Sequence, residues 1–293
     1  MPPDPPYEKL IAGYDGSDRA ADGLALAERL ADVTGAELLV VAVVPHEFPY
    51  APGTPEREGV LRGQAEDMLA DAIAESDRVH ARVVATRSPA QGLHDLAESE
   101  QADAVLLGSS HRGPLGRVLA GSVAERLLHG APCPVAVAPA GYREGSHGMG
   151  VVACAFDGYD EARLALRHAE YLARCTGGVL RVLAVHEPEL IFGIDQVPGA
   201  YDRVELGRLE RKRLTRALEE AAASIEPGIE VRHDLLDGSA VEALAGAAAD
   251  GVDLLVVGSR GYGPVRRVLL GGVSSGLMRS SPVPVLAVPR AAG

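Results

Sequence analysis

Residues 258–277 read GSRGYGPVRRVLLGGVSSGL, a glycine-rich stretch between two apolar runs. The run before it, DLLVV (253–257), and the run after it, PVPVLAVP (282–289), are short and rich in valine and leucine, which is typical of buried strands. Residues 108–127, GSSHRGPLGRVLAGSVAERL, have the same layout. The chain therefore leaves a buried strand through a glycine-rich turn twice.

The rest of the chain repeats in the same way. VVACAFDGYD (151–160) aligns with LIAGYDGSD (10–18), which places Asp157 over Asp15, and the two glycine-rich turns align with Gly258 over Gly108. The second unit carries extra residues between these points, and we assign them to 187–203. We predict two domains, residues 1–140 and 150–293, joined by a linker at 141–149.

Apolar and amphipathic segments alternate in each unit. ELLVVAVVP (37–45) is almost continuously apolar, as expected for a strand covered on both faces, and the helical spacing of 19–35 ends at Gly35. Further helices are predicted near 56–77, from Pro89 and near 115–129. This alternation predicts an α/β fold of two tandem, doubly wound, parallel five-stranded sheets with helices on both faces, a Rossmann-like architecture. Ligands of such sheets bind beyond the carboxyl ends of the strands, where strand order reverses.

Composition excludes several classes of protein. A formal charge of −13 makes a nucleic-acid partner a poor expectation, because phosphate backbones are bound by basic surfaces. There is no 18-residue apolar run and no secretory signal at the N-terminus, so we expect no membrane association. The 3 cysteines have no metal-ligand spacing, which favours a reducing cytoplasm.

The glycines have a functional and a structural interpretation. A helix N-terminus exposes unpaired N–H groups, and glycines before it let the backbone approach a phosphate closely. Gly258, Gly261 and Gly271 would surround a polyphosphate in this way; the alternative is that they serve only as turns and close-packing points. The patterns GxxxxGK[ST], G-x-G-x-x-G after the first strand and SGGxDS are absent, so neither a Walker site, a standard dinucleotide site nor an ATP-pyrophosphatase is predicted.

In combination these residues resemble the universal stress protein family. That family has G-x2-G-x9-G-[ST] after its fourth strand and Asp-Gly-Ser after its first. The second unit has Gly258-x2-Gly261-x9-Gly271-Gly272 with DGY at 157–159, and the first has Gly108-x2-His111-x9-Gly121-Ser122 with DGS at 15–17. HGAPCPVAVAP (129–139) is similar to the closing sequence of the family domain. The chain is thereby identified as a tandem member with an adenine nucleotide alpha hydrolase-like fold.

The resemblance implies a ligand and its contacts. In ATP-binding members adenine lies against the second-strand valine, ribose near the first-strand Asp, and the phosphates on the glycine turn and Ser/Thr hydroxyl. ATP, with or without Mg²⁺, is the implied ligand. The implied contacts of the first unit are Asp15, Val43, Leu107, Gly108, His111, Gly121, Ser122 and Val123. Those of the second unit are Asp157, Val185, Val257, Gly258, Arg260, Gly261, Gly271, Gly272 and Val273.

Each unit departs from the family pattern once. His111 replaces the second glycine, and its ring either crowds the phosphates, is neutral, or donates a hydrogen bond to them. Gly272 replaces Ser/Thr, which keeps a backbone N–H but loses a hydroxyl bond worth about 0.5–1.5 kcal/mol. The second unit keeps all three glycines and adds Arg260, Arg266 and Arg267, so we favour it as the better site, although such arginines are commonly solvated helix-face charges. For Val43 and Val185, the alternative to adenine contact is that they are ordinary core residues of the sheet.

No catalytic constellation is found in the sequence. Asp15 and Asp157 are single carboxylates at strand ends, and no histidines pair at i, i+4. We therefore expect a nucleotide-binding stress-response protein that is not an enzyme, in which any ATP hydrolysis is slow and incidental. The competing hypothesis is an interaction protein of the same fold that no longer holds phosphate.

Partners are predicted from the last strand of each unit. PCPVAVAP (132–139) and SPVPVLAVP (281–289) are bracketed by prolines, so we expect them at sheet edges, where they need covering. The resemblance implies that the two domains pair through these strands; a homodimer through another surface is left open. The 187–203 insert is a lid, a docking patch or a loop packed on its own domain.

Overall fold

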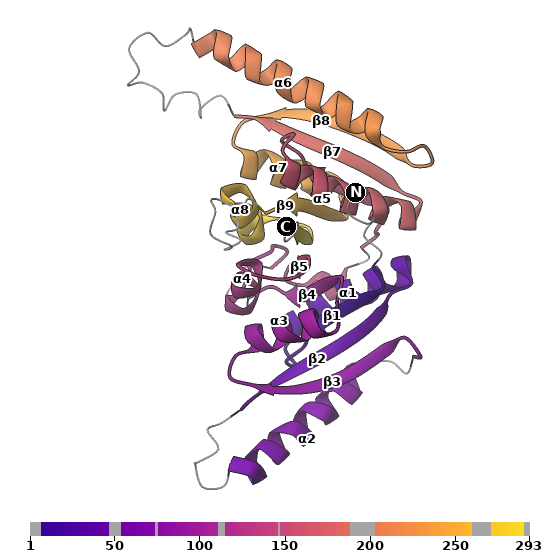
Figure 1. Ribbon diagram of the computed structural model, residues 1–293, viewed down its shortest axis with the longest axis vertical. Coiled ribbons are helices and arrows are strands. Elements are labelled where there is room, and N and C mark those ends of the chain that lie inside the picture. The colour runs from indigo at the N-terminus through magenta and orange to yellow at the C-terminus, as the bar shows by residue number, and fades with distance from the viewer. Residues whose placement is uncertain are drawn as a thin grey trace.

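The computed structural model describes residues 7–46, 54–73, 76–110, 115–145, 147–187, 203–259 and 271–289. Within these residues, 10 strands form a single sheet in the order β3-β2-β1-β4-β5-β10-β9-β6-β7-β8 (Figure 1). No helix in this part of the chain is long and apolar enough to cross a membrane.

Each half of the sheet is one copy of the repeat. In the first half the strands are β1 (Lys9–Gly13), β2 (Glu37–Pro45), β3 (Val79–Thr86), β4 (Ala104–Gly108) and β5 (Val135–Ala138). In the second they are β6 (Val151–Ala155), β7 (Val179–His186), β8 (Glu230–Asp237), β9 (Leu254–Gly258) and β10 (Val285–Val288). All pairings inside a half are parallel. Chain order reverses beside β1 and β6, which confirms the doubly wound prediction.

Helices cover both faces of the sheet. One face carries α1 (Asp18–Thr34), α2 (Thr54–Ala72), α5 (Asp160–Thr176) and α6 (Arg203–Ser224). The other carries α3 (Pro89–Ser99), α4 (Ser122–Leu128), α7 (Ala240–Ala249) and α8 (Gly272–Ser280). The predicted helix of 19–35 is α1: the Ser17 hydroxyl accepts from the Ala20 amide at its start, and Gly35 ends it at φ 77°.

The two halves join through the last strand of each. β5 and β10 pair antiparallel, with Val137 opposite Val285 and Ala136 opposite Leu286. Every residue of both strands is buried. The proline-bracketed strands therefore lie at the edge of their own half, as predicted, and each covers the other's open edge. The two predicted five-stranded sheets are thereby joined into one ten-stranded sheet.

The helix predicted near 115–129 is shorter than expected. It begins at Ser122, because the preceding backbone bonds to the other half of the molecule instead of to its own helix. The amides of Val118 and Ala120 donate to the carbonyls of Ser281 and Met278 at 2.8 and 2.7 Å. Gly116, at φ 73°, turns the chain into this path.

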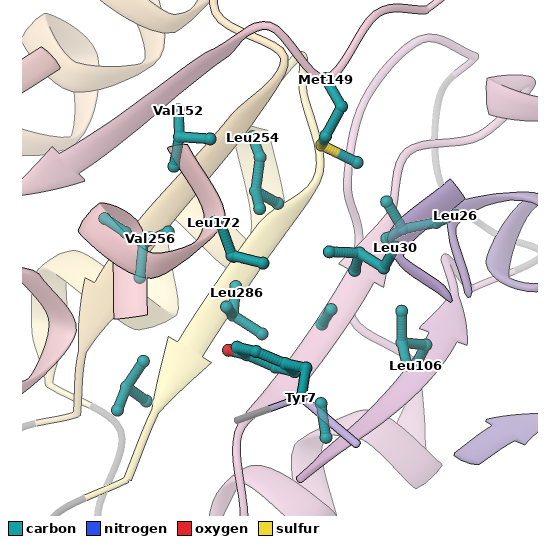
Figure 2. Packing of buried hydrophobic residues seen from close by; sticks show 14 of the residues in the cluster. Tyr7, Leu26, Leu30, Leu106, Met149, Val152, Leu172, Leu254, Val256 and Leu286 are labelled. Atoms are coloured by element: carbon teal, nitrogen blue, oxygen red, sulfur yellow. The ribbon is translucent and has the colours of Figure 1, made fainter. Parts of the chain in front are cut away.

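A hydrophobic cluster closes the junction on the α1 and α5 face. Leu26 and Leu30 of α1 belong to the same buried cluster as Leu172 of α5 and Leu286 of β10 (Figure 2). Tyr7 enters this cluster from the chain preceding β1 and is 1% exposed. Because both halves supply its members, burial of this cluster stabilises their association as well as each half alone.

A buried polar pair sits within the cluster. The Tyr7 hydroxyl lies 2.9 Å from Nδ1 of His168 on α5, and their rings meet edge to face at 5.7 Å. Burial, with a smaller contribution from Arg167, lowers the pKa of His168 to about 4. His168 is therefore neutral near pH 7. Leu26 occupies the corresponding position of α1, so α1 has no imidazole at this position.

The segment between the halves is tied to α1. The buried Asp22 carboxylate accepts from the amides of Gly141 and Arg143 at 2.8 and 2.9 Å. These amides flank the entry to a short 3-10 helix, Tyr142–Glu144. Arg29 of α1 donates to the Gly145 carbonyl at 3.2 Å. The predicted linker is thus folded onto the first half, because its amides find a buried acceptor there.

We predict that replacing His168 with Leu weakens the acid sensitivity of the fold. A histidine of ordinary pKa near 6.5 in the unfolded chain binds a proton that the native chain accepts only near pH 4. Unfolding is therefore favoured as pH falls through this window, by about 2 kcal/mol between pH 7 and 4.5. Urea unfolding at both pH values should show a smaller loss of stability in His168→Leu than in the wild type.

Tyr7→Phe is the matched control for this prediction. It removes the hydrogen bond and keeps the titrating imidazole, so the wild-type pH dependence should persist at a lower overall stability. Equal pH dependence in the wild type and His168→Leu would contradict the assignment.

Candidate functional site

A cavity of about 600 Å³ opens at the carboxyl ends of β6, β7 and β9. β6 lies between β9 and β7 in the sheet, so the cavity occupies the point where strand order reverses. Residues of α6 and α7 and the N-terminal ends of α5 and α8 complete its walls. The second half thus has a ligand-sized hollow at the position where its topology predicts one.

Seven of the residues predicted for the second unit line this cavity. They are Asp157, Val185, Val257, Gly258, Gly271, Gly272 and Val273. Arg260 and Gly261 lie outside the described residues, as do Arg266, Arg267, His111 and almost all of the 187–203 insert. The structure therefore brings together residues that are separated by more than a hundred positions in the chain, from the ends of three strands and the start of one helix.

The start of α8 forms one wall of the cavity. Gly271 is its N-cap, and no side chain caps the first turn. A Cβ added at Gly272 would meet nothing within 4 Å, so the backbone here borders open space. The Ser274 hydroxyl donates to the Gly258 carbonyl at 2.7 Å and ties α8 to the end of β9. A helix start of this kind presents amides and the positive end of its dipole to the cavity.

Gly108 and Gly258 are required by packing. A Cβ at Gly108 would lie 1.6 Å from the Arg19 carbonyl oxygen, and one at Gly258 would lie 2.7 Å from that of Glu161. Both glycines let the first turn of the following helix, α1 or α5, approach the end of the sheet. Close packing by itself requires glycine at these two positions, whereas Gly272 has room for a side chain.

The turn after β6 carries Asp157 into the cavity. The Asp157 carboxylate accepts from the Tyr159 amide at 3.1 Å, and Gly158 between them has φ 87°. The first half has the same turn, in which Asp15 accepts from the Ser17 amide at 3.1 Å. Each Asp thus shapes its own turn as well as facing the strand ends.

Helix α6 contributes a charged pair that sequence reasoning missed. Arg213 donates from Nε and Nη2 to the two carboxylate oxygens of Glu210 at 2.9 and 2.7 Å. Its Nη1 donates to the Asp157 carbonyl at 3.0 Å. The guanidinium holds the pKa of Glu210 below its ordinary value. The i, i+3 spacing of Glu210 and Arg213 signals a helix ion pair, but nothing in the sequence places this pair at the cavity.

The described lining is acidic and otherwise apolar. The carboxylates of Asp157, Glu161, Glu187 and Glu210 face one guanidinium, that of Arg213. Among the described residues no group of three His, Cys, Asp or Glu is arranged to hold a metal ion. The apolar part comes from β7, β9 and the two helices, including Leu183, Leu206, Leu214 and Leu244. A ligand that fits this cavity has a flat or apolar part and a polar part that the start of α8 can hold.

The predicted residues of the first half occupy the equivalent strand ends. Leu107 is buried in β4, and Val43 of β2 is half-buried beside Gly92 of α3. Gly121 is the N-cap of α4, whose first residues are Ser122 and Val123. Val123 packs against the hydrophobic cluster of this face, so core packing accounts for part of its role.

The repeated, doubly wound sheet with a cavity at its switch point defines a tandem α/β protein with a candidate ligand site. The model of the universal stress protein family matches residues 6–139 and 149–289. The chain therefore belongs to the universal stress protein family, with two copies of its domain.

Relatives and solved structures agree with this assignment. The chain is 28% identical to universal stress protein Rv2319c of Mycobacterium tuberculosis, covering 96% of this chain and 99% of that protein. A universal stress protein of Thermus aquaticus is 33% identical over 137 residues, which cover 44% of this chain and 96% of that protein. A crystal structure of a universal stress protein from Archaeoglobus fulgidus has a TM-score of 0.64 at 23% identity and covers 96% of this chain and 98% of its own. That likeness supports the fold.

We predict opposite outcomes for alanine at two of the glycines. Gly108→Ala places a methyl group against a backbone carbonyl and should cost about 3 kcal/mol or more of stability. Gly272→Ala enters open space at the first position of α8 and should change stability by less than about 0.5 kcal/mol, or raise it. Urea unfolding midpoints measure both, and similar losses for the two variants would contradict the distinction.

Proposed function

We propose that the second half of the chain binds ATP in the cavity beside β6, β7 and β9. The observation that carries the proposal is the convergence of seven residues, implied by the family resemblance to contact nucleotide, on one cavity. The protein then acts as a nucleotide-binding stress-response regulator without rapid turnover. Its three cysteines are free, and Cys133 and Cys154 are buried, which fits a reducing, cytoplasmic setting.

The chemistry of the cavity fits the three parts of a nucleotide. A volume of about 600 Å³ is within the usual range for small-molecule sites. Val185 and the leucines around it offer an apolar wall for a base, and the Asp157 carboxylate offers an acceptor for sugar hydroxyls. The uncapped start of α8 offers amides to phosphate oxygens. Mg²⁺ would accompany the phosphates, since the described residues offer them few positive charges.

The same geometry supports slow turnover. The Ser274 hydroxyl, in the first turn of α8, is engaged with the Gly258 carbonyl. Arg213 is held by Glu210 and by the Asp157 carbonyl at the sugar end of the proposed site. Stabilising charge developing on a transferred phosphoryl group requires a cation aimed at it, and the described residues of the cavity supply none.

The alternative function is an interaction protein of the same fold that holds no nucleotide. The acidic lining favours it, because the described part of the cavity wall carries more carboxylates than cations, a balance that does not attract polyphosphate. The two hypotheses differ in one measurable property, the retention of ATP by the purified chain.

We predict that the purified protein binds ATP and that Gly272→Ser tightens the binding. The serine restores the hydroxyl of the family pattern at a position with room for it. One added hydrogen bond of about 0.5–1.5 kcal/mol corresponds to roughly a twofold to tenfold gain in affinity. Heat-released nucleotide and isothermal titration with ATP and Mg²⁺ measure both effects.

Gly246→Ser is the matched control for this gain. Gly246 lies on the exposed side of α7, where an added side chain also meets nothing within 4 Å, and it does not line the cavity. Its ATP affinity should equal that of the wild type. A wild-type chain that releases no nucleotide and gives no heat with ATP would establish the interaction-protein alternative.

A further inference from the structure

A side chain of the covering helix α6 contacts the turn that carries Asp157 from outside the sheet. Arg213 of α6 donates from Nη1 to the Asp157 carbonyl at 3.0 Å. This carbonyl belongs to the peptide that leads into Gly158, whose φ of 87° sets the direction of the turn. The position of the Asp157 carboxylate in the cavity therefore depends on where α6 holds the Arg213 guanidinium.

The guanidinium is itself fixed on its other edge. Nε and Nη2 form a bidentate pair with Glu210 at 2.9 and 2.7 Å, a planar arrangement that lysine cannot reproduce. The guanidinium also lies over the Tyr159 ring, 5.3 Å from its centroid. Arg213, Glu210, Tyr159 and Asp157 all line the cavity. Arg213 thus connects the Asp157 carbonyl and the Tyr159 ring, which lie on either side of Gly158, to the Glu210 carboxylate of α6.

The equivalent helix positions of the first half carry other residues. A Cβ at Gly16 would meet Met68 of α2, and a Cβ at the equivalent Gly158 would meet Ala217 of α6, which sets the register of the two helices. In this register Gln64 stands at the position of Arg213 and Leu61 at that of Glu210. The same Asp-Gly turn therefore packs against the Met68 thioether in one half and is bound by an ion pair in the other.

We propose that Arg213 is a positioning residue that sets the sugar specificity of the second cavity. By fixing the Asp157 turn, Arg213 aims the carboxylate at the hydroxyls of a ribose, so that ribonucleotides bind more tightly than 2′-deoxyribonucleotides. The inference rests on the proposed function, since it concerns the same cavity. Arg213 acts through Asp157, and the phosphates at the start of α8 lie outside its reach.

The test compares ATP with 2′-deoxyATP on the full chain. The variant Arg213→Gln installs the residue of the first half at this position. By titration calorimetry, wild-type protein should prefer ATP, and Arg213→Gln should lose about fivefold to tenfold in ATP affinity with less than a twofold change for 2′-deoxyATP. Because Arg213 contacts only the second cavity, the binding event that changes is assigned to that cavity.

Two further variants separate positioning from a general loss of structure. Arg216→Gln removes an exposed arginine one turn along the same helix, where it pairs with Glu220 at 2.7 Å, and should leave both affinities unchanged. Glu210→Gln keeps Arg213 but weakens its bidentate anchor, and should shift the ATP to 2′-deoxyATP ratio in the same direction by a smaller factor. Melting temperatures report whether each variant is folded.

The outcomes distinguish this inference from the function on which it rests. A wild-type chain that binds both nucleotides equally, or an Arg213→Gln chain that loses both in equal proportion, overturns the sugar-specificity role while nucleotide binding stands. A wild-type chain that binds neither nucleotide overturns the proposed function as well. A shift of the ratio toward unity in Arg213→Gln, with a smaller shift in Glu210→Gln and none in Arg216→Gln, supports the assignment.

Discussion

The antiparallel pairing of β5 with β10 is the constraint on which the rest of the molecule depends. It converts two exposed apolar edges into the centre of one sheet and places α1 beside α5, where both halves contribute to a single cluster. The same junction lets residues 115–121 reach the carbonyls at the end of α8. The start of α8 lines the cavity of the second half. One short helix is therefore in contact with the glycine-rich turn of one half and with the candidate site of the other.

Most of the architecture could be predicted from the sequence, because the signals that define each element are local and occur in both copies of the repeat. Continuous apolar runs, the Gly35 cap and the glycine-rich turns each indicate an element, and the constant spacing between copies shows that the elements recur in one order. The predictions that failed concern contacts between the halves. The helix predicted from 115 begins at Ser122, because the amides of Val118 and Ala120 find acceptors across the junction. No periodicity within one unit carries that information.

The candidate site was predictable in part for a related reason. Residues at strand ends and helix starts, such as Asp157 and Gly271, follow from topology, since the carboxyl ends of parallel strands meet at one edge. The Arg213–Glu210 pair of α6 could not be placed at the site in this way, because a charged pair on an amphipathic helix has the same sequence signature whether it faces solvent or a cavity. The burial of His168 was missed likewise: its partner, Tyr7, lies 161 residues away in the other half.

The structure distinguishes the glycines of the motif that packing requires from those that packing leaves free. Gly258 permits the close approach of α5 to the sheet, and a side chain there would collide with a carbonyl whatever the cavity holds. Gly272 borders open space and is free of that requirement. Gly258 is therefore needed to build the fold, and would persist in a chain that had lost its ligand. It follows that the residues most informative about binding are those that packing does not demand: the start of α8, the Asp157 carboxylate, and the Arg213–Glu210 pair of α6.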